Sequence, residues 1–176
     1  MKFVPGILIA SILIFSLLFT NTSSSSLLYY PKQFVPSHCI SVNGMPDPKC
    51  TPGLANPNVT QDNIQKTICK SGYSSSIRPP VSYTEPLKKQ LMKSYGFTDS
   101  LSNYELDHLI PLEVGGNPSD VKNLWPQGHY GKSKSFEKDK FENYLHKQVC
   151  SGALSLQQAQ MEISTNWPYY WNKVTK

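Results

Sequence analysis

An apolar N-terminal segment followed by four cysteines limits what this chain can fold into. Residues 1–24 contain one early lysine, then an apolar run that ends at Phe19, and then polar residues. This order is typical of a secretory signal peptide. An uncleaved N-terminal membrane anchor is the alternative, because the run is long and no A-x-A cleavage site follows it. Either alternative places the rest of the chain outside the cytoplasm, where it is secreted or held at the membrane.

An even number of cysteines in an exported chain indicates disulfides, and four cysteines allow three pairings. The four are Cys39, Cys50, Cys69 and Cys150. We favour a local bridge between Cys39 and Cys50 and a long-range bridge between Cys69 and Cys150. A structural zinc site is the alternative, but no two of these cysteines form a C-x-x-C pair.

About 150 residues remain after the N-terminal segment. This length is enough for one domain with a hydrophobic core and too short for two such domains. Residues 25–59 are rich in proline, glycine and asparagine and predict a loop-rich N-terminal segment. Residues 60–176 carry the periodic apolar patterns and predict the folded domain. The net charge of +5 falls to +4 when Lys2 is removed with the signal (5 − 1 = 4), which suits a polyanionic partner. No protein partner is indicated, and a membrane is a partner only if the N-terminal segment is retained.

Apolar residues at helical spacing, with capping residues before them and glycines after several of them, predict helices in four places. These are residues 60–72 and 84–96, capped by Thr60 and Thr84, residues 135–149, and a last helix from Ser155 toward Trp167. Between them, residues 104–110 predict a strand that ends before Pro111, and residues 122–135 predict a loop. A short return strand can follow the glycine pair. The expected fold class is α+β, a mainly helical single domain with a small β-hairpin.

Asp107 and His108 are adjacent in the sequence ELDHLIPLEVGG. Successive strand residues point to opposite faces, so the two can serve one site only where the strand ends, and Pro111 supplies such an end. A carboxylate that holds a divalent metal beside an imidazole that accepts a proton provides most of a hydrolytic site. The structural alternative is a carboxylate that only fixes a histidine tautomer.

The pieces DHLIPLEVGG, NLWPQ and HYGK, in this order before a helix, resemble the HNH endonuclease family and its exported bacterial-type HNH-like group. The resemblance implies a ββα-metal core within the α+β fold. It also implies that Asp107 holds a divalent metal, that His108 accepts a proton from the attacking water, and that Asn123 braces the histidine's loop. His129 would be the second metal ligand, and Asp139, Glu142 or His146 on the following helix is the alternative.

The resemblance implies an exported, metal-dependent endonuclease that hydrolyses DNA, or RNA as the less favoured substrate. The metal would be Mg or Mn, with Zn as the alternative. Lys132 and Lys134, with Lys138 and Lys140 behind them, would contact flanking phosphates. Two rival hypotheses stay open: an inactive HNH-derived binding or structural module outside the cytoplasm, and a phosphodiesterase with a different substrate.

Overall fold

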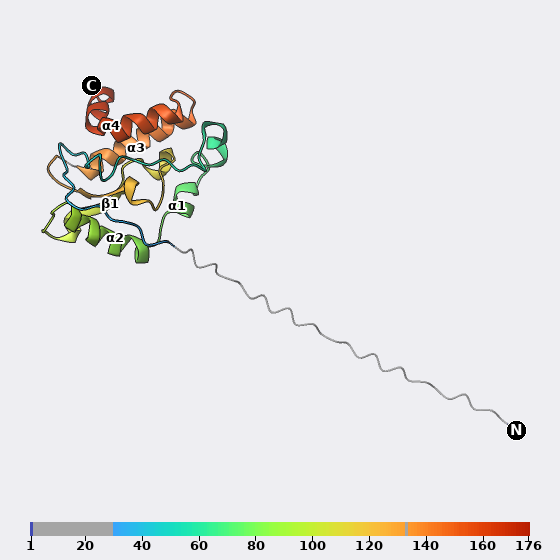
Figure 1. The fold of residues 1–176 in the computed structure, drawn as a ribbon. Coiled ribbons are helices and arrows are strands. Elements are labelled where there is room, and N and C mark those ends of the chain that lie inside the picture. Colours follow the sequence, from blue (N-terminus) through green and yellow to red (C-terminus); the bar gives the residue numbers. More distant parts are fainter. Residues whose placement is uncertain (2–29, 133) are drawn as a thin grey trace.

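A computed structural model of the chain describes Met1, residues 30–132 and residues 134–176. The predicted signal peptide or anchor, residues 1–24, lies outside the described residues apart from Met1. The described part is a mainly helical single domain with a small two-stranded antiparallel sheet (Figure 1). The α-helices are α1 (Tyr73–Ile77), α2 (Val81–Ser94), α3 (Ser135–Cys150) and α4 (Leu156–Val174), the strands are β1 (Tyr104–His108) and β2 (Leu124–Gly128), and the 3-10 helices are η1 (Gln61–Lys66), η2 (Leu101–Asn103), η3 (Leu112–Val114) and η4 (Val121–Asn123).

The two strands pair so that Asp107 lies opposite Trp125 and His108 lies opposite Leu124. The prediction of a loop over residues 122–135 is therefore wrong in its first half, which forms η4 and β2. Pro126 has no backbone N–H to donate, yet it is tolerated opposite Leu106 because both strands of a two-stranded sheet are edges. Strand β1 ends at His108, two residues earlier than the predicted strand over residues 104–110 and three residues before Pro111.

The predicted helices differ from the observed ones mainly at their starts. Residues 60–72 form η1 and a turn in place of a longer helix, because the Asn63 side chain accepts from the Thr60 backbone and the Thr67 hydroxyl and so favours a local turn. Helix α2 begins at Val81, so Thr84 lies inside it and does not cap it. The predictions for α3 and for the Ser155 cap of α4 agree with the structure.

Helices α3 and α4 pack together on one side of the hairpin, and α2 covers the other side (Figure 1). The larger core lies between α3, α4 and the turns of η1 and η3, with Phe141, Leu145, Ile163 and Trp167 at its centre. Burying each such side chain contributes about 1.5–3 kcal/mol. No described helix is long and apolar enough to cross a membrane.

Disulfides join Cys39 to Cys50 and Cys69 to Cys150, in the pairing that we favoured. The first closes a loop within residues 30–59, which contain no helix or strand beyond isolated bridges in their described structure. The second ties the end of α3 to the turn after η1. Two disulfides indicate an oxidising, extracellular environment.

The two disulfides should differ in their effect on stability because they close loops of different length. The sequence separations are 81 residues for Cys69–Cys150 and 11 for Cys39–Cys50. Loop-closure entropy predicts losses of about 4.5 and about 3 kcal/mol when each pair is replaced by serines. Urea unfolding of the two double variants measures this, and a larger loss for Cys39→Ser/Cys50→Ser would contradict the ranking.

Candidate functional site

The loop that follows β1 is held in one conformation by Asn123, which is fully buried at the start of β2. Its side-chain oxygen accepts from the backbone N–H groups of Ile110 and Leu54, and its amide donates to the carbonyls of Ile110 and Asn117. A side-chain amide can therefore satisfy four backbone groups of two crossing segments. Asn123 thus links the loop after His108 to the loop-rich segment at Leu54.

The glycine pair that ends this loop is required by a close backbone approach. A Cβ at Gly116 would lie 1.7 Å from the carbonyl oxygen of Ile110, a distance that no side chain can occupy. Gly115 has φ of 77°, in the left-handed region that glycine adopts without strain. The pair thus lets the loop fold back against its own start, where Gly116 donates its N–H to the carbonyl of Pro111 at 2.9 Å.

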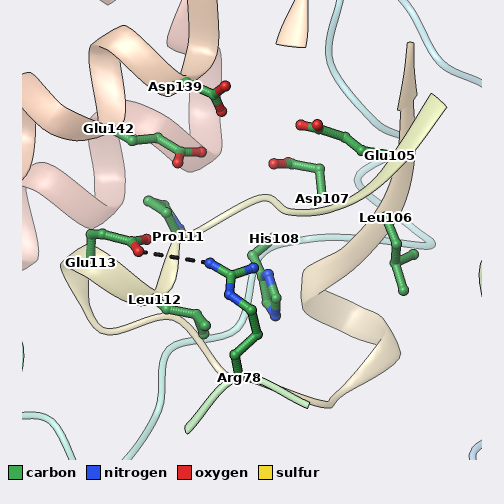
Figure 2. Close-up of a pocket in the computed structure, with 10 residues that line it drawn as sticks. All are labelled: Arg78, Glu105, Leu106, Asp107, His108, Pro111, Leu112, Glu113, Asp139 and Glu142. Carbon is green, nitrogen blue, oxygen red and sulfur yellow. Dashed lines mark ion pairs between the residues drawn. The ribbon is translucent and has the colours of Figure 1, made fainter. Parts of the chain in front are cut away.

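A cavity of about 230 Å³ opens beside the end of β1. Figure 2 shows that Asp107 and His108 both line it, as predicted for a strand that ends there. Most of the other polar lining residues are charged and come from β1, η3, α3 and the segment before α2. They are Arg78, Glu105, Glu113, Asp139 and Glu142. The cavity therefore brings five carboxylates, one guanidinium and one imidazole together.

The Asp107 carboxylate is bound by a lysine that is completely buried. The ammonium of Lys138 on α3 lies 2.9 Å from Oδ2 and 3.1 Å from Oδ1 of Asp107. It also donates to the carbonyl of His108 at 2.9 Å and to Glu142, so all three of its N–H groups have partners. The indole N–H of Trp125 donates to Oδ2 of Asp107 at 2.9 Å. Two hydrogen bonds, one from Lys138 and one from Trp125, leave this carboxylate about two of its four lone-pair positions for a further ligand.

Burial and charge act in opposite directions on the pKa values in this network. Burial alone would lower the pKa of Lys138, but Asp107 and Glu142 raise it above its ordinary value. Burial raises the pKa of Glu142 to about 8 despite the attraction of Lys138, and it also raises the pKa of Asp107. The Lys138 ammonium is therefore charged at neutral pH.

Glu105 lies beside Asp107 on β1, and both carboxylates point toward Asp139 on α3 (Figure 2). Burial, followed by the nearby charges of Asp107 and Asp139, raises the pKa of Glu105 to about 7. Burial and Asp107 also raise the pKa of Asp139. These carboxylates repel one another, and a bound cation would remove that repulsion.

His108 is buried, and its protonation state is set by one backbone carbonyl. Its Nε2 lies 2.9 Å from the oxygen of Pro118, which can only accept, so Nε2 carries the proton and Nδ1 has the free lone pair. Among the described residues, Nδ1 has no hydrogen-bond partner. Burial, followed by the charge of Arg78, lowers the pKa of His108 to about 4. The imidazole is therefore neutral at physiological pH.

Arg78 and Glu113 form an ion pair across the mouth of the cavity, with 3.8 Å between the guanidinium and the carboxylate (Figure 2). The Arg78 side chain is 54% exposed. A half-exposed guanidinium beside a neutral histidine can bind an anionic group that enters the cavity. No local sequence pattern points to Arg78, which lies far from the Asp-His pair along the chain.

The remaining predicted site residues lie outside this cavity. The Nδ1 of His129 is 2.8 Å from the Ser135 hydroxyl and 4.0 Å from Glu105, so the ring borders the cavity without lining it. Lys132 and Lys134 line a separate groove. Lys138, which the sequence grouped with the phosphate-contacting lysines, is buried in the ion network and cannot reach a phosphate.

His146 lies on another side of α3, where its Nε2 donates to the carbonyl of Ile68 at 3.0 Å. One ring nitrogen of His146 and the sulfurs of Cys69 and Cys150 lie within 4.8 Å of one another, a group that could hold a metal ion. The two sulfurs form a disulfide, however, and only thiolates are ligands. This group could therefore bind a metal only after reduction.

Comparisons with known proteins find no significant match to a protein-family model, to a curated protein or to a solved structure. The function is therefore inferred from the geometry of the cavity and from the sequence motifs.

Replacing Lys138 should be strongly destabilising because Asp107 would remain buried without its cation. We expect Lys138→Met to lower the free energy of unfolding by about 3–5 kcal/mol at neutral pH. Lys140→Met is the matched control, since Lys140 is exposed on the same helix, and its effect should stay within about 0.5 kcal/mol. Urea unfolding of both variants provides the measurement, and equal effects would show that the buried network is not important for stability.

The stability of the protein should depend on Glu105 in a defined pH window. The folded protein holds this proton more tightly than the unfolded chain, so the contribution is complete below pH 4.5 and is lost as the pH rises through about 7. In chelator, Glu105→Gln should therefore melt a few degrees above the parent at pH values above 7. The difference should disappear below pH 4.5. Asp62→Asn, which removes an exposed carboxylate outside the cavity, controls for net charge, and a pH-independent difference for Glu105→Gln would refute the assignment.

Proposed function

We propose that the protein is a metal-dependent phosphodiesterase of the HNH endonuclease type, acting on DNA or RNA outside the cytoplasm. The observation that carries this proposal is the neutral His108, which has an unpaired Nδ1 and lines one cavity together with Asp107, further carboxylates and Arg78. The resemblance of DHLIPLEVGG and NLWPQ to HNH motifs supports it, because Asp107, His108 and Asn123 fall on the matching positions. The proposed ββα-metal core consists of β1, β2 and α3, of which β1 and α3 line the cavity.

The roles of the chain's own residues follow from their contacts. The Pro118 carbonyl fixes the His108 tautomer, so that Nδ1 accepts the proton of the attacking water. Arg78 pairs with a non-bridging oxygen of the phosphate. An anionic phosphate beside His108 raises the basicity of the ring, because it stabilises the imidazolium that forms. Asn123 keeps the loop after His108 in place and takes no part in proton transfer.

The donor set of the cavity fits a hard divalent cation. Glu105, Asp107 and Asp139 offer carboxylate oxygens, which Mg and Mn prefer, and their mutual repulsion favours a bound cation. His129 borders the cavity next to Glu105 and would be a further ligand. A cation held there would offset the negative charge that develops on the phosphate and the departing oxygen.

The rival proposal is a binding or structural module in which the same residues have no catalytic role. The ion pair between Asp107 and Lys138 favours it, because the carboxylate already has a buried cation as its partner and about half of its hydrogen-bonding capacity is used. In this version the Asp-His pair anchors the end of β1 to α3. The two proposals differ in whether His108 is needed for hydrolysis or only for folding.

Nicking of supercoiled plasmid, and cleavage of RNA, by the oxidised protein should require added Mg or Mn and should stop in excess chelator. His108→Ala should lower the rate by roughly two to four orders of magnitude, because it removes the proton acceptor. Asp139→Asn should instead raise the Mn concentration needed for half-maximal rate, since Asp139 is exposed at the rim and its loss leaves the buried network intact. Initial rates measured at a series of metal concentrations report both effects.

His38→Ala is the matched control, because His38 is an exposed histidine outside the cavity, and it should nick at the parental rate. Melting temperatures of the same variants separate the two proposals. A His108→Ala protein that nicks as fast as the parent, or cleavage that continues in chelator, would end the catalytic proposal. A parental rate at background, with melting temperatures lowered by His108→Ala and Asn123→Ala, would support the rival.

A further inference from the structure

A second groove, of about 300 Å³, lies between the start of α3 and the C-terminal half of α4. Its wall is formed by Trp171 and Pro168, and its polar lining includes Lys132, Lys134 and two asparagines, Asn43 and Asn172. The groove is distinct from the cavity at His108 and shares no residue with it. Its volume is at the low end of ligand sites and suits one small group.

A kink in α4 creates this groove. Asn166 departs from helical geometry with φ of −166° and ψ of 67°, and its side chain accepts from the N–H of Tyr169 to start the second part of the helix. Pro168 follows in the first turn of that part, where its missing N–H costs nothing. The kink directs Trp171 toward α3, where one side of the indole packs on Phe141 with 6.0 Å between the ring centroids. Trp171 is therefore a partly buried, pre-positioned aromatic surface.

The charges beside this aromatic surface favour an anion. Within the described part of the chain, Lys132 forms no ion pair, and its hydrogen-bond acceptor is an amide oxygen, Oδ1 of Asn43, at 3.4 Å. Lys134 is paired with Glu137 at 3.1 Å. The groove thus has a net charge of +1, from two lysines and one glutamate, and Lys132 can bind a phosphate without breaking an ion pair. An aromatic face next to a lysine is the combination that binds an unpaired nucleotide.

The groove lies close to the catalytic cavity along the chain. Glu137 faces the groove, while Lys138 and Asp139 on the same turn of α3 belong to the ion network and the cavity. Lys132 follows shortly after the end of β2. Since residues two apart point to nearly opposite sides of a helix, a strand that places a phosphate at His108 would have to pass around the start of α3 to reach Trp171.

We propose that this groove binds one unpaired nucleotide of the substrate, its base stacked on Trp171 and its phosphate paired with Lys132. The inference rests on the proposed function and adds that the preferred substrate is single-stranded nucleic acid. A base pair cannot enter, since its partner strand would have to occupy the same narrow groove. A neutral oligosaccharide, which also stacks on tryptophan, is the competing ligand that the lysines disfavour.

Binding in chelator tests the groove without cleavage. Fluorescence anisotropy is measured with a short labelled oligothymidylate, with a chain of the same length that lacks bases, and with a duplex. Trp171→Leu should weaken oligothymidylate binding by about tenfold and leave the base-free chain unaffected. Lys132→Gln should weaken both single strands, and Lys147→Gln, at an exposed position near the other end of α3, should weaken neither.

Melting temperatures show whether Trp171→Leu is folded, and Lys132→Gln, at an exposed position, keeps the test valid if it is not. Equal affinity for the oligothymidylate and the base-free chain, equal affinity for the duplex, or a neutral oligosaccharide that competes for the groove would each overturn the inference. Hydrolysis of bis(4-nitrophenyl) phosphate by the wild-type protein is measured in a separate assay, with added Mg or Mn and without chelator. Oligothymidylate binding that depends on Trp171 without any hydrolysis refutes the proposed function alone, and hydrolysis without that dependence refutes the groove alone.

Discussion

The ammonium of Lys138 is the contact on which the arrangement of the cavity depends. It joins Asp107 and the backbone of His108 on β1 to Glu142 on α3, so one buried cation fixes the strand end against the helix. Its charge also limits the repulsion among the carboxylates that line the cavity. An apolar residue in its place would leave Asp107 buried beside apolar atoms, where a carboxylate is expensive to keep ionised. Lys138 therefore determines both the position of the strand end and the charge balance of the cavity.

Asn123 has the corresponding role on the backbone side. It connects the segment after His108 with the loop-rich segment at Leu54. Gly116 allows the loop after His108 to pack closely against its own start at Ile110. The histidine itself needs only one further contact, the Pro118 carbonyl, to expose its Nδ1. Rigid supports thus surround a base with one free nitrogen, which is the arrangement expected for a site that must act without reorganisation.

The sequence predicted the elements whose patterns are local. Helix α3 was found from Phe141, Leu145 and Val149, and the Asp-His pair was placed at a strand end because Pro111 follows. Strand β2 was missed because Pro126 and Gly128 are typical of loops, and only pairing with β1 makes this segment a strand. Arg78 reaches the cavity through tertiary packing, and no local pattern announces such a contact. Lys138 was predictable in part: the apolar stripe of α3 extends one turn toward its start and meets that residue, so a charged side chain there had to be buried with partners.

The contacts of residues 30–59 affect how well the protein resists proteases in an extracellular environment. A long stretch without regular secondary structure is normally where proteases cut first. Here, the Cys39–Cys50 bridge, the Trp167 indole bound to the Gly44 carbonyl and the pairing of Ala55 with Gly116 hold the stretch against the body. A protease must bind an extended substrate strand, and these contacts remove the freedom to form one. A single cut between Cys39 and Cys50 would also leave both fragments covalently attached, so the protein would be nicked without being lost.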